Sequence, residues 1–415
     1  MKFVADLHIH SPYARATSKE MTLENLDKWA QIKGITVMGT GDFTHPIWFK
    51  ELQDKLEEAE SGLYKLKDKE TNTRFMLTSE ISCIYSKNGS VRKVHMLLFS
   101  PSFDAVEKIS ARLAVVGNLH SDGRPIIGID AKEVTRIALE ASPDCLVVPA
   151  HIWTPWFAVF GSKSGFNTLQ ECFDEYTKYI YAVETGLSSD PAMNWQVSDL
   201  DNVALISNSD SHSLGKIGRE ANFFDTTVSY PAIADAIKTK DPSKFLFTVE
   251  FFPEEGKYHY DGHRACSVSL DPKESLENNN ICSVCNRPLT IGVLNRVQEL
   301  ADRKEGVKPA GAIPFKSLIP LIEIIGEAKQ MGVASKAVQG EYAKMIEKFG
   351  NEFTILLDSD ITELQDLALP EIAEGIKRVR EGNVAIEPGY DGEYGKIQIF
   401  AKGEQQLTTN QSSLF

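Results

Sequence analysis

The sequence predicts an α/β protein whose first half is a barrel in which strands and helices alternate. Apolar, strand-like runs at residues 3–9, 35–38 and 146–150 are separated by segments with helical spacing, an order typical of a parallel sheet or barrel. A histidine or a carboxylate stands at or near the end of most of these runs. Chemistry in such barrels lies at the carboxyl ends of the strands, so we expect these side chains to converge.

Helices are expected where apolar residues recur with a period near 3.6. The predicted helices cover residues 22–33, 102–116, 131–141, 295–303, 315–330, 337–348 and 369–380. With 415 residues, the chain is expected to hold more than one domain. We assign residues 1–245 to the barrel, 246–290 to a small zinc-binding module, 291–400 to a mainly helical C-terminal domain and 401–415 to a flexible tail.

The first apolar run holds two histidines, His8 and His10, in i, i+2 spacing. A strand would place Asp6, His8 and His10 on one face, so that one metal ion could take both imidazoles. A buried histidine pair satisfied by hydrogen bonds is the alternative. The metal site is favoured by further ligand-type residues at later apolar runs, which are Asp42, His45, Glu80, His95, His151, Asp210 and His212.

The donor types indicate the chemistry. Nitrogen and carboxylate donors without thiolate suit zinc, manganese, iron or magnesium. Clustered ions that share a carboxylate can lower the pKa of a bound water towards about 7 and stabilise both oxygens of an in-line phosphoryl displacement. Phosphoester hydrolysis is therefore the predicted reaction. Serine or cysteine nucleophiles are not indicated, because the chain has no GxSxG motif and Cys83, Cys145 and Cys172 lie in apolar or helical surroundings.

A structural zinc site is predicted from two ligand pairs with two intervening residues each, His263 with Cys266 and Cys282 with Cys285. His259 competes with His263 for the fourth position. A disulfide is the alternative, but no signal peptide and no even framework of cysteines is seen, so a zinc ion in a cytoplasmic protein is expected. Closed four-ligand sites stabilise small modules, and we expect no catalytic role.

Charge alone does not indicate a nucleic-acid enzyme, since the formal net charge is −14. Residues 257–316 are locally more basic, with nine Lys and Arg against seven Asp and Glu, whereas residues 317–400 have eight against fifteen. No apolar stretch approaches the about 20 residues that span a membrane. Each candidate DNA-binding residue could instead be an ordinary surface or core residue; the candidates are Trp153, Trp156, Arg219, Arg264, Arg287 and Arg296.

With these motifs, roughly the first 240 residues resemble the polymerase and histidinol phosphatase (PHP) superfamily, which implies a distorted (β/α) barrel with up to three metal ions. The resemblance implies two ligand sets that share one glutamate: His8, His10, Glu80 and Asp210 for one ion, and Glu80, His95 and His151 for a second. It also implies a set of catalytic residues, which are Glu80, Asp210 and His212.

The third metal position is the one where this sequence departs from the superfamily pattern. His212 would serve a third ion, giving a two- or three-metal site of zinc, manganese or magnesium. The usual Thr-Asp-His is altered here, and Phe43 stands where a histidine ligand is usual. Either Asp42 or His45 would then complete the third site.

The last five residues, Gln411 to Phe415, resemble the peptide by which bacterial DNA-processing enzymes bind the sliding clamp. Gln411 is followed by a spacer and by Leu414 and Phe415, an apolar pair suited to a hydrophobic groove on a partner. The resemblance implies a bacterial cytoplasm and a substrate on DNA.

Taken over almost the whole chain, the barrel, the zinc-binding module, the helical domain and the ending resemble the endonuclease Q family of DNA repair enzymes. The resemblance implies hydrolysis of the phosphodiester on the 5′ side of a deaminated base (uracil, hypoxanthine or xanthine) or an abasic site, in double- or single-stranded DNA. Two alternatives remain. A small-molecule phosphatase of the histidinol phosphatase type would leave the C-terminal half unexplained, and a non-catalytic zinc-containing DNA-binding scaffold would leave the ligand-type residues unused.

Overall fold

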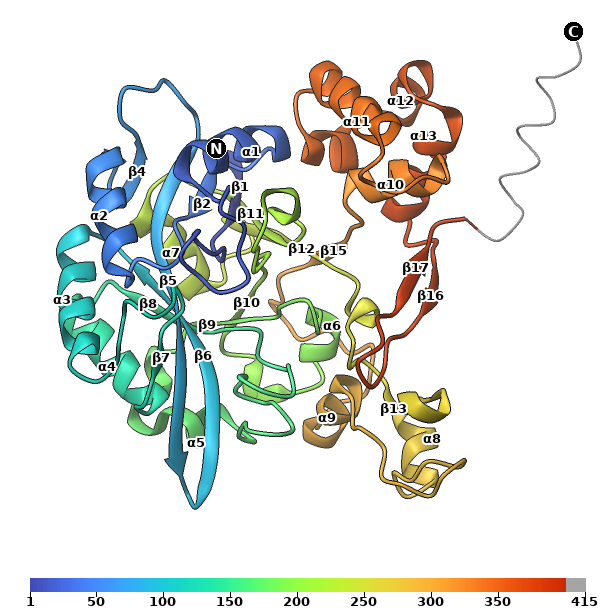
Figure 1. The fold of residues 1–415 in the computed structure, drawn as a ribbon, viewed down its shortest axis with the longest axis horizontal. Coiled ribbons are helices and arrows are strands. Elements are labelled where there is room, and N and C mark those ends of the chain that lie inside the picture. Colours follow the sequence, from blue (N-terminus) through green and yellow to red (C-terminus); the bar gives the residue numbers. More distant parts are fainter. Residues whose placement is uncertain (401–415) are drawn as a thin grey trace, which may run out of the picture.

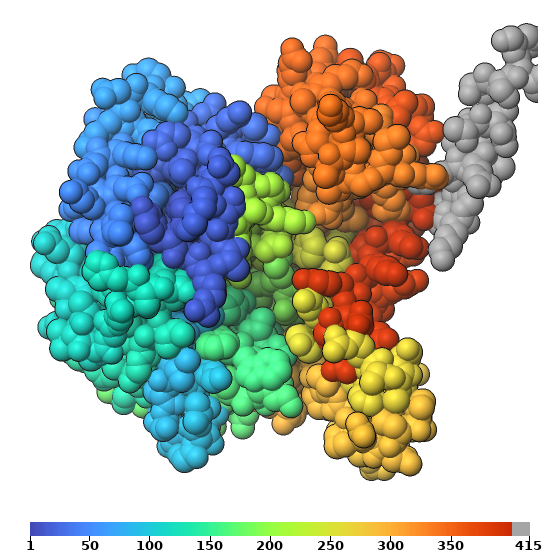
Figure 2. Space-filling view, viewed as in Figure 1, coloured from blue at the N-terminus to red at the C-terminus, as the bar shows by residue number. Residues whose placement is uncertain are grey.

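The computed structural model describes residues 1–400 (Figure 1). The predicted clamp-binding residues Gln411, Leu414 and Phe415 lie outside the described residues. Figure 2 shows the helical C-terminal domain and the zinc-binding module as two lobes on one side of the barrel. Within residues 1–400, no helix combines the length and the apolar character needed to cross a membrane.

The barrel is built on one mixed sheet of eleven strands. Its central strands are β1 (Lys2–Asp6), β2 (Val37–Gly39), β5 (Arg74–Lys87), β6 (Ser90–Ser100) and β8 (Leu146–Pro149). The sheet also contains β3 (Leu56–Glu60), β4 (Leu63–Leu66), β7 (Ile126–Ile127), β11 (Ala221–Asp225), β12 (Phe245–Glu250) and β15 (Phe315–Ser317). A parallel pair, β9 (Ala182–Glu184) and β10 (Ala204–Ile206), lies next to β8.

The sheet is mixed, whereas strand and helix alternation predicted a parallel one. β1, β2 and β5 are parallel neighbours, but β6 pairs antiparallel with both β5 and β8. The reason is a tight hairpin between β5 and β6, where Asn88 and Gly89 have φ of 55° and 75°. Asn-Gly is a strong signal for a two-residue hairpin turn, and it returns the chain directly without a crossover helix.

The barrel closes where the segment after β1 meets the segment after β10. Ile9 and Ser211 form a parallel bridge, and the His10 backbone N–H donates to the carbonyl of Ser211 at 2.9 Å. The Leu7 N–H donates to Asn208 Oδ1 at 2.8 Å. These contacts bring the two ligand-bearing segments from the two ends of the barrel sequence side by side.

Seven helices belong to the barrel, among the described residues. They are α1 (Leu23–Lys33), α2 (Pro46–Lys55), α3 (Phe103–Ala114), α4 (Ala131–Ala141), α5 (Leu169–Phe173), α6 (Pro191–Asn194) and α7 (Tyr230–Thr239). The predictions for α1, α3 and α4 are confirmed. Their boundaries follow from capping: Thr22 accepts a hydrogen bond from the Asn25 N–H at the start of α1, and Gly34 ends α1 with φ of 86°.

The C-terminal half adds a short hairpin, β13 (Asp261–His263) with β14 (Val268–Leu270), and helices α8 (Pro272–Glu277) and α9 (Val293–Leu300). The helical domain contains α10 (Leu321–Ala328), α11 (Lys336–Phe349), a π-helical turn (Thr354–Asp358), α12 (Ile361–Leu367) and α13 (Pro370–Arg380). A last hairpin, β16 (Ala385–Glu387) with β17 (Lys396–Gln398), returns to the zinc-binding module, where the Tyr260 N–H donates to the Gly389 carbonyl at 2.9 Å.

One helix prediction in the C-terminal half is wrong in part. Residues 315–330 were expected to form a single helix, but Phe315–Ser317 forms β15 and pairs with β12, and α10 begins only after Pro320. Pro314 and Pro320 flank the strand and prevent a continuous helix. The sheet therefore includes residues 246–250 of β12 as well as β15, both of them beyond residue 245.

A buried ion pair joins the helical domain to the barrel. Lys33 Nζ, at the end of α1, lies 2.6 Å from Glu352 Oε2, and both side chains are at most 5% exposed. Glu352 also accepts hydrogen bonds from the Tyr342 hydroxyl and the Leu321 N–H. A buried pair in which both carboxylate oxygens are hydrogen-bonded is held in one geometry, so this contact orients the helical domain against the barrel.

Candidate metal centre

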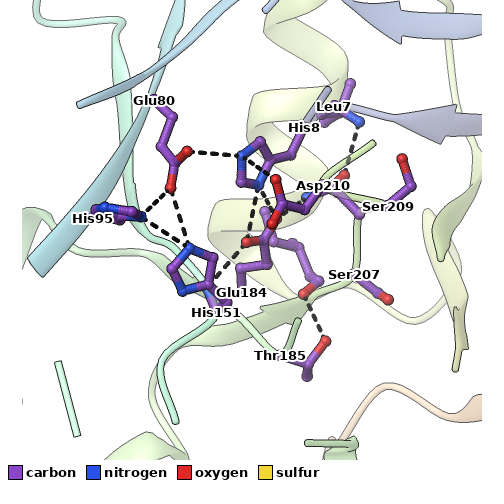
Figure 3. Close-up of polar contacts among 12 residues, drawn as sticks. Leu7, His8, Glu80, His95, His151, Glu184, Thr185, Ser207, Ser209 and Asp210 are labelled. Carbon is purple, nitrogen blue, oxygen red and sulfur yellow. Dashed lines mark hydrogen bonds and ion pairs between the residues drawn. The ribbon is translucent and has the colours of Figure 1, made fainter. Parts of the chain in front are cut away.

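Two groups of ligand-type side chains meet at one end of the barrel (Figure 3). The first group is His8, His10, Glu80 and Asp210, and the second is Glu80, His95 and His151. Within each group the ligand atoms lie within 4.8 Å of one another. The structure thus brings together, in the two sets predicted from sequence, residues that follow β1, β8 and β10 or lie within β5 and β6.

Glu80 lies between the two groups, and each of its carboxylate oxygens faces one of them. Oε2 lies 3.5 Å from His8 Nε2 and 3.3 Å from His10 Nε2. Oε1 lies 2.6 Å from His95 Nδ1 and 3.1 Å from His151 Nε2. A carboxylate presented in this way can bridge two metal ions. Glu80 and His95 meet because β5 and β6 pair with Glu80 opposite Leu97 and Ser82 opposite His95, which makes them diagonal neighbours on one face.

The two histidines of the first group are held by carboxylates on their far ring nitrogens. His8 Nδ1 lies 3.0 Å from Glu184 Oε1, and His10 Nδ1 lies 3.1 Å from Asp42 Oδ1. Such carboxylates fix the tautomer of a ligating histidine and orient its ring. The Nε2 atoms are therefore directed at the centre of the group, where His8 Nε2 is buried without a hydrogen-bond partner. That unpartnered nitrogen, together with the mixed nitrogen and oxygen donors, fits a divalent metal ion.

Glu184 was not predicted from the sequence, yet it contacts ligand-type residues of both groups. It ends β9 and is fully buried, and it also accepts hydrogen bonds from Asn208 Nδ2 and from the His151 backbone N–H, each at 3.0 Å. One carboxylate thus positions a ligand from each group. The sequence pattern that could have indicated Glu184 is the one that indicated the ligands, namely a carboxylate at the end of an apolar run.

The residues considered for a third ion lie outside the two groups. Asp42 is engaged by His10 and by the Ser11 N–H, whose distance to Asp42 Oδ2 is 2.6 Å. His45 stacks on Tyr13 with ring centroids 4.5 Å apart, and Phe43 is buried in the core. Among residues 1–400, no third group of ligand-type side chains forms in the barrel, and the third metal position stays a prediction.

His212 lies at the rim of the site. Its ring centroid is 4.3 Å from that of His10, its Nδ1 lies 3.0 Å from the Asp210 carbonyl oxygen, and 31% of its side chain is exposed. His212 is therefore accessible from solvent, unlike His8 and His10.

The electrostatics of the groups differ. Burial acts to lower the pKa of His8, but the charges of Glu184 and Asp210 raise it well above its usual value. His10 behaves in the same way: burial lowers its pKa, and Asp42 and Asp210 raise it above the usual range. In the second group the two imidazoles differ. Burial lowers the pKa of His95 to about 4, so that this imidazole is neutral near pH 7. Burial also acts to lower the pKa of His151, but Glu80 raises it above its usual value.

The predicted zinc ligands also converge. His263, Cys266, Cys282 and Cys285 form a third group of ligand atoms within 4.8 Å, with Cys285 Sγ 3.4 Å from His263 Nδ1. Desolvation acts to raise the pKa of the Cys282 thiol, but the backbone N–H groups of Cys285 and Val284 lower it to about 6, which favours the metal-binding thiolate. His259 lies elsewhere, 4% exposed and beside Tyr260, so the structure brings His263 rather than His259 to the cysteines.

Two predicted DNA-binding residues are corrected by the structure, because both are buried. Trp153 is 1% exposed and donates from Nε1 to Asn194 Oδ1 at 2.7 Å. Arg296 is 7% exposed and donates to the carbonyl oxygens of Phe160 and Phe166, so it attaches α9 to the barrel segment between β8 and α5. Neither side chain is available to a ligand.

The other candidates are accessible to different degrees. Trp156 is 42% exposed and makes an edge contact with Tyr258, with ring centroids 6.1 Å apart. The Arg264 side chain is 61% exposed and Arg287 is exposed, both on the zinc-binding module. Arg219 is half-buried and donates from Nε to the Ser209 carbonyl at 3.0 Å, next to the ligand Asp210.

The barrel and its paired ligand groups define the class of protein, an α/β barrel with a candidate centre for divalent metal ions. Comparisons of the sequence and the fold with known proteins identify the family. Residues 320–383 match the family model described as the MJ0043 C-terminal domain. The uncharacterized protein YqxK of Bacillus subtilis is 31% identical over 414 residues, which cover 96% of this chain and 99% of YqxK.

The uncharacterized protein MJ0043 of Methanocaldococcus jannaschii is 34% identical over 255 residues, which are 60% of this chain but 31% of MJ0043, so the match spans about a third of that relative. The crystal structure of the lesion-specific endonuclease PfuEndoQ from Pyrococcus furiosus is 30% identical, with a TM-score of 0.86 and coverage of 99% of both chains. Endonuclease Q in complex with a 27-mer duplex bearing an abasic lesion is also 30% identical, with a TM-score of 0.85 and coverage of 97% of this chain and 98% of that one. The chain belongs to the endonuclease Q family.

The raised pKa values of His8 and His10 predict proton release when metal binds. In the metal-free protein both imidazoles still hold protons at pH 7, and a ligating nitrogen must lose its proton. The apparent affinity for Mn²⁺ should therefore rise with pH and fall in acid. Titration calorimetry in buffers of different ionisation enthalpy measures the released protons. Equal heats in all buffers at pH 7 would contradict the assignment.

Removal of one zinc ligand should unfold the zinc-binding module. In such modules the free energy of metal binding is also free energy of folding, so Cys282→Ser should lose its zinc and become sensitive to protease within residues 255–295. Zinc content and limited proteolysis measure the two effects. The matched control is Ser283→Ala, an exposed neighbour between the ligands. A Cys282→Ser protein that keeps its zinc and its protease resistance would show that the cluster is not a zinc site.

Proposed function

We propose that this chain is a DNA repair endonuclease that hydrolyses the phosphodiester on the 5′ side of a deaminated base, namely uracil, hypoxanthine or xanthine, or of an abasic site. The observation that carries the proposal is the pair of ligand groups sharing Glu80, in a chain that a lesion-specific endonuclease matches from end to end at 30% identity. The duplex bound by a family member carries an abasic lesion, which supports DNA as the substrate here too.

The ligand groups fit two divalent ions, of zinc, manganese or magnesium, one on His8, His10, Glu80 and Asp210 and one on Glu80, His95 and His151. When bound, such ions supply a water of lowered pKa and stabilise the charge that develops on the phosphate. The side chains of the protein position the ligands and exclude water from the site. Glu184 and Asp42 hold the imidazoles of His8 and His10 in one orientation, and burial of Glu80 excludes water from the shared carboxylate.

Asp210 and His212 stand on the open side of the centre. Asp210 has a 26% exposed side chain and His212 a 31% exposed one, whereas Glu80, His8 and His10 are almost fully buried. We assign Asp210 to the metal position nearest the substrate. His212 contacts the bound phosphodiester or the third ion that the superfamily pattern implies.

DNA would approach over the surface between the barrel mouth and the zinc-binding module. Trp156 and Tyr258 provide aromatic rings on this path, and Lys257 lies 4.4 Å from the ring centroid of Tyr394, which is 70% exposed. Aromatic faces bind unstacked bases with roughly 1–3 kcal/mol each, which offsets much of the cost of extruding a nucleotide. Arg264 and Arg287 add positive charge on the module itself.

We also propose a sliding clamp as a partner, through Gln411, Leu414 and Phe415, which lie outside the described residues. The basis is the sequence alone: a glutamine, a spacer and a terminal apolar pair. A short apolar peptide of this kind binds a preformed groove on its partner.

The proposed activity is tested with 5′-labelled duplexes that carry one deoxyuridine, one deoxyinosine or one abasic site, incubated with Mn²⁺ or Mg²⁺. Cutting is expected on the 5′ side of each lesion and not in an undamaged duplex. Asp210→Asn should slow cutting by at least about 10²-fold, because it removes a ligand charge beside the reacting phosphate. Asp104→Asn, on the exposed face of α3, is the control.

Equal cutting of damaged and undamaged duplexes would contradict lesion specificity. Turnover of a phosphomonoester without any cutting of DNA would instead indicate a phosphatase, and a fully active Asp210→Asn protein would refute the ligand assignment.

Deletion of residues 411–415 tests the clamp proposal. The shortened chain should lose binding to an immobilised bacterial sliding clamp and should cut short oligonucleotides at the rate of the full chain. Unchanged clamp binding by the shortened chain would refute the assignment of these residues.

A further inference from the structure

One positively charged side chain at the site, that of Arg124, belongs to neither ligand group. No sequence motif predicted its position there. Arg124 Nη1 donates to Glu80 Oε2 at 3.0 Å, on the oxygen that faces the first ligand group. Among residues 1–400, Arg124 is the single Lys or Arg within ion-pair distance of a carboxylate in either group. Its side chain is 27% exposed, whereas that of Glu80 is fully buried, so Arg124 reaches from the centre to the open surface.

The loop that carries Arg124 is fixed to the barrel on both sides. The Gly123 N–H donates to the Tyr13 carbonyl at 3.1 Å, and the Pro125 carbonyl accepts from the Ser82 N–H at 3.0 Å. The loop also packs closely on the carboxylate that orients His10, since a Cβ at Gly123 would lie 2.4 Å from Asp42 Oδ2. A backbone held in this way presents the guanidinium at a set position, as a preorganised site requires.

The guanidinium has more donors than it uses. It carries five N–H groups, and within the described part of the chain its one side-chain partner is Glu80. A residue needed only to neutralise Glu80 would be expected to lie buried with the carboxylate. Arg124 instead keeps part of its planar, forked donor set towards solvent, and that geometry matches the oxygens of a phosphate.

We propose that Arg124 binds a non-bridging oxygen of the phosphodiester that is cut, while its contact with Glu80 keeps it aimed at the metal centre. This proposal rests on the proposed endonuclease function. It assigns to Arg124 the contact with the negatively charged phosphate of the substrate beside the metal ions. Negative charge grows on those oxygens in the transition state, so a fixed cation there lowers the barrier to hydrolysis.

The test compares Arg124→Gln, Arg124→Lys and the wild-type chain in single-turnover cutting of the abasic duplex, with bound metal measured on the same samples. Arg124→Gln should lower the rate at saturating enzyme by about 10²-fold and leave the bound metal unchanged. Arg124→Lys should be faster than Arg124→Gln but slower than the wild-type chain, because lysine keeps the positive charge but lacks the planar, bidentate donors of the guanidinium. Arg112→Gln, on the exposed face of α3, is the matched control.

A second readout reports the phosphate contact independently of chemistry. Binding of the same duplex is measured in Ca²⁺ across salt concentrations, and Arg124→Gln should reduce the slope of log affinity against log salt by about 1. A rate within threefold of wild type with an unchanged slope would overturn the proposal. So would a slow variant that has lost metal and is restored by excess Mn²⁺, since Arg124 would then serve only to hold Glu80.

These outcomes are distinct from failure of the proposed function. If the wild-type chain cuts the abasic duplex and Arg124→Gln matches it in both rate and salt slope, the Arg124 proposal alone fails. If the wild-type chain cuts no DNA, the proposed function fails, and the salt slope then decides whether Arg124 contacts phosphate.

Discussion

The carboxylate of Glu80, fully buried between four imidazoles and a guanidinium, is the constraint on which the rest of the site depends. Burial acts to raise the pKa of Glu80, but His95 and Arg124 hold it well below its usual value, so the group stays charged. A buried charge is tolerated only when its partners are fixed around it. The barrel fixes these partners because β1, β5, β6, β8 and β10 place their ligand-type side chains around Glu80.

A second layer of polar contacts keeps these strand ends in register. Asp6 accepts hydrogen bonds from the Ser209 and Gly218 N–H groups at 3.0 and 2.9 Å, so it holds the segment that carries Asp210. Burial raises the pKa of Asp6 to about 6, a cost that these hydrogen bonds only partly offset. Asp6 shares the first apolar run with His8 and His10, but its role is to hold Asp210 in place rather than to bind metal.

Much of the site could be predicted because its ligands follow apolar runs and its zinc ligands have diagnostic spacing. Side chains whose role depends on tertiary contacts could not be predicted. Glu184 resembles any other carboxylate until it is seen beside His8, and Arg124 lies in a polar loop without a motif. Trp153 and Arg296 are residue types common on nucleic-acid surfaces, yet Trp153 is buried with its Nε1 hydrogen-bonded to Asn194, and Arg296 is buried against the carbonyl oxygens of Phe160 and Phe166. The short strand β15 exists only because it pairs with β12.

The position of Glu80 between the two ligand groups would let its carboxylate be shared by two divalent ions. Anomalous scattering from crystals of the protein soaked in Mn²⁺, recorded on both sides of the manganese absorption edge, tests it directly. We expect two manganese peaks in the barrel, one within coordination distance of each Glu80 oxygen, with His8, His10 and Asp210 around the first and His95 and His151 around the second. A single ion, or a pair of ions with Glu80 in contact with at most one of them, would contradict it.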